Sequence, residues 1–519
     1  MSEPYYITTA ISYPNGAPHI GHAYEAIAAD AIARFHKAQG RDVRFQTGTD
    51  EHGLKMAQAA RTDGSEPGAY AEKMSAHFKE MCDVLNVRYD RFIRTSNPAH
   101  HRASQALWQA MEANGDLYLG RYEGWYSVRD EAFYDESELT GEGDERRSPQ
   151  GTPVEWTVEE SWFFKLSEYQ QPLLDHYAAD PEFIQPDSRR NEVLRFVEGG
   201  LNDLSISRTS FDWGIKVPGD DKHVMYVWLD ALTNYLTGLG YPDGGELFDR
   251  YWPANVHLIG KDVVRFHAVY WPAFLMSAKI ALPKQIYGHG FLLSRGEKMS
   301  KSVGNVVDPL DLAARYGVDA LRYFLLREVT FGQDGTFSAE AIVTRCNAEL
   351  SNSFGNLAQR VLSFIAKNVP ENLLFNEPLT VADTSLLLDV SRYMSDLERE
   401  FQSLAFSQGI DAWMRAVFAC NQYIDAQAPW TLRKTDSQRM KAVLATLVNC
   451  IRILAIAIRP VVPSSSDRVL DQIGVPKDEN ERNFQAIEDP FWHLRRKHVA
   501  APPQPVFPRL EMPVEDAVT

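Results

Sequence analysis

Residues 5–22 of the chain read YYITTAISYPNGAPHIGH. The apolar, β-branched run Tyr5–Thr9 predicts a strand, and the proline, glycine and asparagine at 13–18 predict a tight turn. The following residues predict a helix over Ile20–Gln39, because their apolar side chains recur on one face: Ile27, Ala31, Ile32 and Phe35. A second strand is expected at Val43–Thr47. This order of strand, turn, helix and strand is the repeating unit of a parallel α/β sheet.

The first strand–helix turn carries His19-Ile20-Gly21-His22, at the place where an open α/β sheet binds phosphate groups. Gly21 lets the backbone approach a ligand closely. His19 and His22 are three residues apart at a helix start, so both imidazoles can donate hydrogen bonds to phosphate oxygens. Taken alone, the motif is also compatible with two surface histidines, or with a metal site whose third ligand lies elsewhere in the sequence.

A second motif, Lys298-Met299-Ser300-Lys301-Ser302, lies between Gly296 and Gly304. Two lysines three residues apart on a mobile loop can grip a triphosphate, although an isolated pair is also typical of a solvated basic turn. The two motifs together match, without substitution, the HIGH and KMSKS signature pair of the class I aminoacyl-tRNA synthetases. The predicted ATP-binding residues are His19, Gly21, His22, Lys298, Ser300 and Lys301.

Composition sets wide limits on the class of protein. The 519 residues carry a formal charge of −17, with 44% hydrophobic and 24% charged residues, which is ordinary for a globular chain of several domains. The acidic balance excludes a generally basic nucleic-acid coat but not a local basic site. The four cysteines form no Cys-x-x-Cys spacing, so neither a disulfide framework nor a cysteine-based zinc site is expected, and a reducing cytoplasm is the predicted location.

The pattern along the chain predicts a Rossmann-like α/β catalytic domain that is interrupted by a small connective insertion and followed by an all-α bundle. The predicted segments are 1–115 and 221–335 for the catalytic domain, 116–220 for the insertion, 336–500 for the helical domain and 501–519 for an extended tail that packs back on the body. Residues 441–459 are largely apolar but include Thr446, Asn449 and Arg452. We therefore predict a buried bundle helix there and no membrane span.

Six further segments carry a specific resemblance. They are AISYPNG at 10–16, TGTDEHG at 47–53, YVWLDA at 226–231, HLIGKD at 257–262, NLAQR at 356–360 and APW at 428–430. On these segments the chain resembles the methionyl-tRNA synthetases over nearly its whole length.

The resemblance implies a methionine pocket lined by Ile11, Tyr13, Trp228, Ala231, Tyr235, Val263 and His267, with Asp50 binding the ammonium group. The chemistry agrees, because a thioether is apolar, polarizable and only a weak hydrogen-bond acceptor. An aromatic box suits its flexible chain, and a tyrosine hydroxyl and a histidine ring can approach the sulfur. On spacing alone, Trp228 and Tyr235 could be core residues and Asp50 could be a helix N-cap.

The resemblance also implies the reaction. Methionine and ATP form methionyl adenylate and pyrophosphate, and the methionyl group then passes to the terminal adenosine of the initiator and elongator methionine tRNAs. His19 and His22 would contact the α- and β-phosphates, Lys298 and Lys301 would cover the leaving pyrophosphate with Mg²⁺ assisting, and Arg208 matches a catalytic arginine of the family. Asn356, Arg360 and Trp430 would read the anticodon, although the first two could also form a solvated polar face.

Two features depart from much of the family. Residues 83–345 contain no cysteine, whereas many members carry Cys-x-x-Cys zinc knuckles in the insertion, and Leu232 follows the Trp-Leu-Asp-Ala run where some members have proline. We therefore predict a zinc-free insertion held by packing alone, in a monomer. The competing hypotheses are a leucyl, isoleucyl, valyl or cysteinyl synthetase, a catalytically silent tRNA-binding paralogue, and a small adenylyltransferase, which would not need so large a helical domain.

Overall fold

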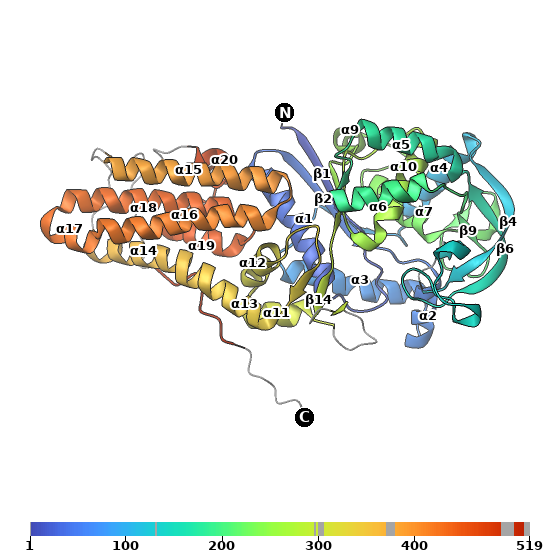
Figure 1. Cartoon of the computed structure of the whole chain (residues 1–519), viewed down its shortest axis with the longest axis horizontal. Helices are drawn as coiled ribbons and strands as arrows, with labels where there is room; N and C mark the ends of the chain where they lie inside the picture. Colours follow the sequence, from blue (N-terminus) through green and yellow to red (C-terminus); the bar gives the residue numbers. More distant parts are fainter. Residues whose placement is uncertain are drawn as a thin grey trace, which may run out of the picture.

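The computed structural model describes residues 2–129, 132–294, 297–298, 306–369, 379–488 and 503–512. The molecule is elongated, with the α/β part and its insertion at one end and a helical bundle at the other (Figure 1). This arrangement confirms the predicted fold class.

A six-stranded parallel sheet forms the centre of the α/β part, in the order β3-β2-β1-β12-β13-β7. Its strands are β1 (Pro4–Thr9), β2 (Asp42–Thr49), β3 (Arg91–Arg94), β7 (Ile184–Gln185), β12 (Val256–Gly260) and β13 (Ile286–His289). The predicted first strand, helix and second strand are β1, α1 (Ile20–Ala38) and β2. Burial on both faces explains their apolar sequences, since strand residues Ile7 and Phe45 and helix residue Ile27 are all fully buried.

The sheet reverses its direction of growth between β1 and β12. From β1 the chain adds β2 and β3 on one side, and from β12 it adds β13 on the other, with all pairs parallel. Crossover segments therefore leave the carboxyl ends of β1 and β12 on opposite faces of the sheet, and a crevice opens between them.

Residues 116–220, predicted as one insertion, contribute to three different sheets. One of them is the small antiparallel sheet β10-β11-β9, with β9 (Ser207–Arg208), β10 (Lys216–Val217) and β11 (Asp220–Met225). Most of the insertion's strand residues form an antiparallel sheet in the order β5-β4-β6-β8, built from β4 (Leu117–Ser127), β5 (Ala132–Tyr134), β6 (Glu155–Phe164) and β8 (Leu204–Ser205). β7, however, pairs with β13 and completes the edge of the parallel sheet. A two-residue strand is too short to show any alternation, so β7 could not be predicted from the sequence pattern.

The remaining elements around the sheet pack against it or connect it to the bundle. They are α2 (Leu54–Asp63), α3 (Pro67–Val84), α4 (Pro98–Ala113), α5 (Gln170–Ala179), α6 (Asp187–Glu198), β9 (Ser207–Arg208), β10 (Lys216–Val217), β11 (Asp220–Met225), α7 (Val227–Leu232), α8 (Asn234–Thr237), α9 (Glu246–Tyr251), α10 (Trp271–Ser277), β14 (Leu292–Ser294), β15 (Glu297–Lys298), α11 (Pro309–Tyr316), α12 (Val318–Glu328) and β16 (Gly335–Phe337).

The bundle is built from long antiparallel helices around α18. Its members are α13 (Ala339–Cys346), the π-helical segment Asn347–Gly355, α14 (Asn356–Asn368), α15 (Val381–Gln402), α16 (Phe406–Gln427), α17 (Pro429–Thr435), α18 (Ser437–Ile458), α19 (Pro463–Ile473) and α20 (Phe484–Ile487). By length and composition α18 could cross a membrane, but it is almost entirely buried in the bundle, as predicted. Its one buried cation, Arg452, donates to the Asn449 side chain and the Ala486 carbonyl.

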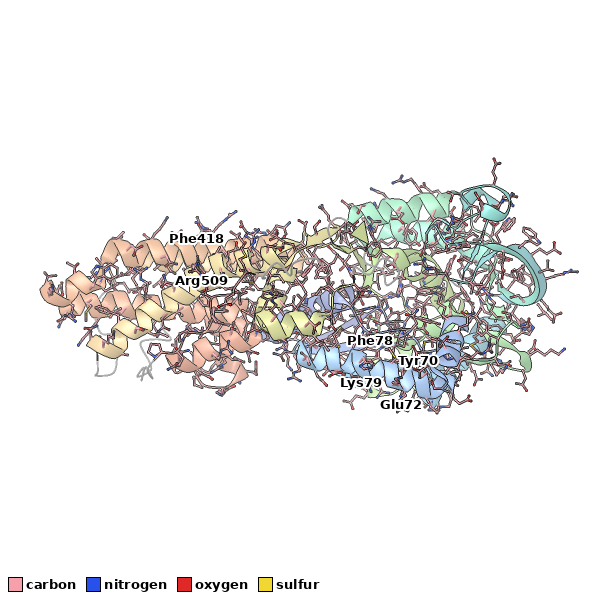
Figure 2. All side chains as sticks on the ribbon, turned by 90° about the horizontal axis from the view of Figure 1, so that it is seen from below. Tyr70, Glu72, Phe78, Lys79, Phe418 and Arg509 are labelled. Atoms are coloured by element: carbon pink, nitrogen blue, oxygen red, sulfur yellow. The ribbon has the colours of Figure 1, made fainter. Side chains whose placement is uncertain are left out.

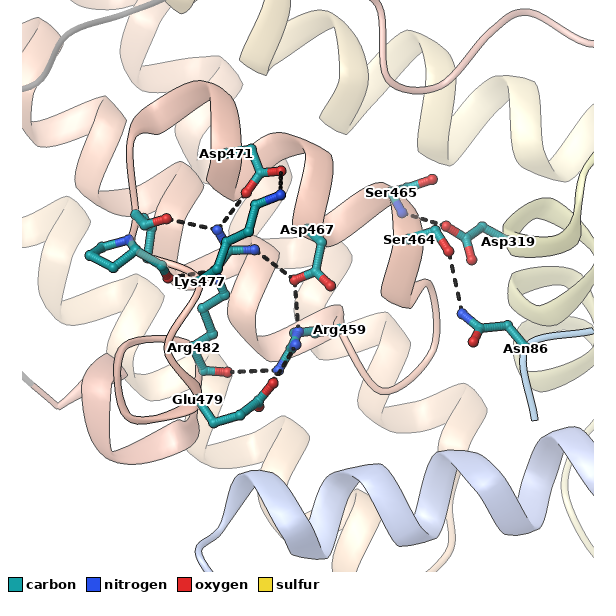
Figure 3. A network of polar contacts seen from close by, with 12 residues as sticks. Asn86, Asp319, Arg459, Ser464, Ser465, Asp467, Asp471, Lys477, Glu479 and Arg482 are labelled. Carbon is teal, nitrogen blue, oxygen red and sulfur yellow. Dashed lines mark hydrogen bonds and ion pairs between the residues drawn. The ribbon is translucent and has the colours of Figure 1, made fainter. Parts of the chain in front are cut away.

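Polar contacts fasten the base of the bundle to the α/β part (Figure 3). The Asp319 carboxylate on α12 accepts from the Ser465 amide at the start of α19, and Asn86 donates to the Ser464 hydroxyl. Deeper in the same junction, the fully buried Arg322 pairs with Asp30 of α1 at 2.6 Å. Arg322 also donates to the Pro460 and Val461 carbonyls after α18, so the helix that carries the histidine motif is tied to the bundle through α12.

The described part of the tail, residues 503–512, runs along the bundle without regular structure. The Leu510 amide donates to the Asn347 side chain at 2.8 Å, and that side chain returns a bond to the Leu510 carbonyl at 2.9 Å. Arg509, in the same segment, is labelled in Figure 2. These contacts agree with a tail that packs back on the body.

Candidate active site

A cavity of about 530 Å³ opens at the carboxyl ends of β1 and β12. All residues predicted for methionine line it, together with part of the histidine motif: Ile11, Tyr13, Asp50, Trp228, Ala231, Tyr235, Val263 and His267, and His19, Gly21 and His22. Segments from four separate parts of the chain therefore converge at the point where the sheet reverses.

The histidine pair is fixed by its own helix start. His19 is the N-cap of α1, where its Nδ1 accepts from the Gly21 amide, and the His19 amide donates to Nδ1 of His22; both distances are 3.1 Å. Because each Nδ1 is an acceptor, Nε2 carries the proton in each neutral ring and is the nitrogen that can donate to a ligand. A Cβ at Gly21 would lie 2.9 Å from the His19 ring, so this geometry requires glycine.

Phe78 of α3 packs against His22 of this pair. Its ring meets the His22 ring edge-on at 5.1 Å between centroids, and Figure 2 labels it. The two imidazoles lie 3.9 Å apart. The pair is a rigid element with two donors directed from one helix end.

Tyr235 and His267 form the inner wall of the cavity. The Tyr235 hydroxyl lies 2.6 Å from Nε2 of His267, whose Nδ1 lies 2.9 Å from the Val263 carbonyl. Burial lowers the pKa of His267 to about 4, so the ring is neutral at physiological pH. Nδ1 then donates to the carbonyl and Nε2 accepts the tyrosine proton. The wall binds its own polar hydrogens and directs none of them outward, which suits a thioether.

Trp228 completes the aromatic side of the pocket by stacking on Phe266, with ring centroids 3.8 Å apart and an interplanar angle of 7°. Spacing alone allowed Trp228 and Tyr235 to be core residues. Tyr235 is indeed 1% exposed, yet it also lines the cavity, so it serves as core and wall together.

Asp50 follows β2 and is buried against the same cavity. Its amide donates to the Ser12 carbonyl at 2.9 Å, which fixes it beside the loop that carries Ile11 and Tyr13. The N-cap of the following helix, α2, is Gly53, so Asp50 is not the helix cap that its spacing allowed.

Arg208 lies in a neighbouring cavity of about 700 Å³ and does not line the one that contains the histidines. Its guanidinium stacks over the Tyr226 ring at 4.7 Å and donates to the Ser205 hydroxyl at 2.9 Å. Of the lysine motif, Lys298 ends β15, while its side chain and the whole of Ser300 and Lys301 lie outside the described residues.

Several lining residues were not predicted from the sequence. Arg129 and Gln150, from two loops of the insertion, line both cavities and mark their junction. Glu25 and His289 also line the first cavity and pair at 2.9 Å, joining α1 to the strand that leads to the lysine motif. Glu25 lies three residues after His22 and could have been found from helical spacing; the other three have no local signature.

The predicted anticodon residues lie at the far tip of the bundle. The Arg360 guanidinium of α14 lies 5.6 Å over the ring of Trp430 on α17, and it pairs with Asp425 at 2.7 Å. Trp430 is 43% exposed, and Asn356 is exposed one turn from Arg360. In Figure 1 α17 and the insertion strands β4 and β6 lie at opposite ends of the molecule.

Within the ranges that the structure describes, no group of three or more histidine, cysteine or carboxylate side chains could hold a metal ion. In the insertion, buried hydroxyls connect the end of β4 to the turn before β6: Thr152 lies 2.7 Å from both Ser127 and Ser148.

Comparisons with known proteins agree over the whole length. Residues 5–362 match the model of the class I tRNA synthetases (M), and residues 376–515 match that of the anticodon-binding domain of methionyl tRNA ligase. The methionine–tRNA ligase of Brucella suis is 55% identical over 513 residues, and that of Mycobacterium bovis is 53% identical over 517; 98% or more of each chain is covered. The Mycobacterium tuberculosis methionyl-tRNA synthetase in complex with methionyl-adenylate superposes with a TM-score of 0.94 at 53% identity, covering 98% of this chain and 100% of that one.

The neutral state of His267 predicts how methionine binding depends on pH. Burial holds the pKa of His267 at about 4, well below that of an exposed histidine. The affinity for methionine should therefore be nearly constant from roughly pH 8 to pH 5.5. It should fall below about pH 5, where protonation turns Nε2 into a donor. Calorimetric titration with methionine alone measures this. The His267→Gln variant should bind more weakly but without that fall. A wild-type midpoint near 6.5 would contradict the assignment.

Proposed function

Because the chain belongs to the methionyl-tRNA synthetase family, we propose that its two adjoining cavities divide the ligase reaction between them. The chain catalyses ATP-dependent attachment of methionine to tRNA, through methionyl adenylate. The observation that carries the proposal is the convergence of the histidine pair, Asp50 and the Tyr235–His267 wall on one cavity. That cavity would bind methionine and ATP, and its neighbour would admit the end of the tRNA.

In the first step a methionine carboxylate oxygen attacks the α-phosphorus, forming the O–P bond of the adenylate while the bond to pyrophosphate breaks. The carboxylate is already ionised at neutral pH, so no general base is needed. In-line placement and stabilisation of phosphate charge are the enzyme's tasks. We assign the phosphate contacts to Nε2 of His19 and His22, supported by their fixed orientation.

Lys298 and Lys301 would then close over the departing pyrophosphate, with Ser300 between them, and Mg²⁺ would enter on the nucleotide and neutralise part of its charge. Arg208, from the neighbouring cavity, would approach the phosphate or carboxylate oxygens from the opposite side. Its stacking on Tyr226 supports a fixed guanidinium there.

Methionine itself would be held at two points. Asp50 provides the charge that pairs with the ammonium group, and the thioether lies against the Tyr235–His267 wall and the Trp228 ring. A side chain that needs a hydrogen-bond donor finds none on that wall, because the tyrosine and histidine protons are already donated. Polar amino acids of similar length would lose their hydration without compensation.

In the second step the 2′-hydroxyl of the terminal adenosine attacks the methionyl carbonyl, the ester bond forms and AMP leaves. The neighbouring cavity offers aromatic faces and cations, which suit a single-stranded nucleic acid end. Arg129 is exposed at the junction, where it would contact a phosphate of the incoming strand. Asn356, Arg360 and Trp430 would read the CAU anticodon at the far tip.

The insertion, the oligomeric state and the cellular location complete the proposal. We propose an insertion without zinc, in which the Ser127, Ser148 and Thr152 hydroxyls connect its loops, and the domain limits given from the sequence. We propose a monomer that acts in the cytoplasm on initiator and elongator methionine tRNAs.

The reaction is tested by amino-acid-dependent exchange of pyrophosphate into ATP, run with each of the twenty amino acids. Methionine should support exchange and the others should not, because polar side chains would lose their hydration against the wall and apolar ones of other shape would fit the pocket poorly. Exchange with leucine, isoleucine, valine or cysteine in its place would favour a sister synthetase. Absence of exchange with any would favour a silent tRNA-binding paralogue.

The anticodon assignment predicts that Trp430→Ala leaves pyrophosphate exchange intact and lowers kcat/KM for tRNA charging about 10- to 100-fold, the worth of one stacked base. Phe418→Ala, which removes a similarly exposed aromatic from α16 (Figure 2), is the matched control and should change neither activity. Loss of exchange in the Trp430 variant would show a structural role.

The junction assignment predicts that Arg129→Ala spares pyrophosphate exchange and slows transfer from preformed methionyl adenylate to tRNA about 10-fold or more, the value of a charge-assisted hydrogen bond to phosphate. Single-turnover transfer measures this directly. Arg121→Ala is the control, because Arg121 lies on β4, the strand that precedes Arg129, and lines neither cavity. Equal loss of exchange and transfer would assign Arg129 to ATP.

A further inference from the structure

Behind the methionine pocket, the carboxylate of Asp230 holds two histidines that the mechanism does not use. Nδ1 of His52 lies 2.6 Å from one oxygen, and Nε2 of His100 lies 2.8 Å from the other. All three side chains are at most 2% exposed, and none of them lines either cavity. A fully buried carboxylate with two imidazole donors is a costly arrangement unless it is geometrically satisfied, as it is here.

The connection joins the two sides of the methionine site. His52 lies two residues after Asp50, on the loop from β2 to α2. Asp230 lies on α7, two residues after Trp228 and immediately before Ala231. The short hydrogen bond between His52 and Asp230 therefore joins two segments of the site. One carries Asp50, which would bind the ammonium group, and the other carries the side-chain pocket.

The third member extends the connection to the inner wall. His100, on α4, places its Nδ1 2.9 Å from the hydroxyl of Thr237 on α8, the short helix that carries Tyr235. Through His100, α4 thus supports both α7 and α8. Movement of α7 relative to the loop after β2, or of α8 relative to α4, would break a buried hydrogen bond.

The loop after β2 is also anchored through Glu51. Glu51, between Asp50 and His52, is fully buried and pairs with Arg94 of β3 at 2.7 Å. Its backbone carbonyl accepts from Trp213 Nε1 at 2.6 Å. Asp50 is therefore presented by a segment whose next two residues, Glu51 and His52, are anchored to different elements.

The electrostatics favour an ionised connection. Burial opposes ionisation of Asp230, but the neighbouring His52, which acts by charge and hydrogen bond, and His100 outweigh it and hold the pKa of the carboxyl well below its usual value. The two imidazole N–H groups then donate to a carboxylate, which makes both hydrogen bonds short and strong.

We propose that Asp230 is a positioning residue which, through His52, fixes the distance between Asp50 and the side-chain pocket and so gauges the length of the amino acid. The inference rests on the proposed methionine site. An amino acid anchored at its ammonium group by Asp50 must place the end of its side chain against the Tyr235–His267 wall. A rigid span rejects a chain that is one methylene longer, a difference worth about 10- to 200-fold in a well-shaped pocket.

The test compares methionine with ethionine, which is one methylene longer, and with norleucine, which has the length of methionine but no sulfur. In Asp230→Asn, the amide nitrogen replaces one carboxylate oxygen and cannot accept from a histidine, so one connection is lost. We expect the methionine-to-ethionine ratio of kcat/KM in pyrophosphate exchange to fall about 10-fold, while the methionine-to-norleucine ratio changes little.

Asp116→Asn is the matched control. Asp116 is also a buried carboxylate, accepting from Tyr169 and Ser277 at 2.6 Å, but it lines neither cavity. It should lower thermal stability without changing either ratio. His52→Ala is a second variant, which removes the connection to the loop while leaving Asp230 paired with His100, and its ratios should follow those of Asp230→Asn.

Proportional loss with methionine and ethionine in both variants would overturn the proposal and leave Asp230 a structural residue only. Absence of methionine-dependent exchange in the wild-type protein would instead contradict the proposed function, so the two failures are distinguishable.

Discussion

The parallel pairing of β1 with β12 is the constraint on which the rest of the molecule depends. Thr8 and His257 lie side by side across it, 249 positions apart in the chain, with 2.7 Å between the hydroxyl and Nδ1. Burial holds the pKa of His257 far below its usual value, so the ring is neutral and bonds within the sheet. Once the two strands pair, their carboxyl ends bring the turn with the histidine pair beside the segment with Val263 and His267.

The wall of that crevice formed by Tyr235 and His267 directs neither of its polar hydrogens toward a ligand. The polar hydrogens of this wall are donated within the protein, from Tyr235 to His267 and from His267 to Val263. Elsewhere on the same cavity, the His19 and His22 rings use their Nδ1 atoms to accept from backbone amides. In the proposed function, selectivity and catalysis therefore differ in which imidazole nitrogen is used within the protein.

The pattern of apolar and polar residues along the chain predicted those helices and strands that form from neighbouring residues. The first strand, the helix after it and the second strand follow from apolar periodicity, and α18 was identified as a buried helix because its polar residues interrupt an apolar run. Motif matches identified residues that line the first cavity, although residue spacing could not show whether Tyr235 is a core residue or a pocket residue. The two-residue strand β7, the junction residue Arg129 and the pairing of His52 with Asp230 across 178 positions leave no local trace. The residues that contact them come close only in the folded chain, when segments far apart in the sequence meet.

The net charge of −17 raises the question of how such a protein holds a polyanion. Several cations near the second cavity and at the bundle tip are already paired: Arg360 with Asp425, Arg265 with Glu138 and Lys261 with Asp334. A phosphate that binds there must replace a carboxylate, so the gain over the existing pair is modest. We therefore expect affinity for arbitrary nucleic acid to be low, while a base that also stacks on Trp430, as proposed, gains a contact that no carboxylate provides. On this proposal, binding depends more on shape and stacking than on attraction by charge.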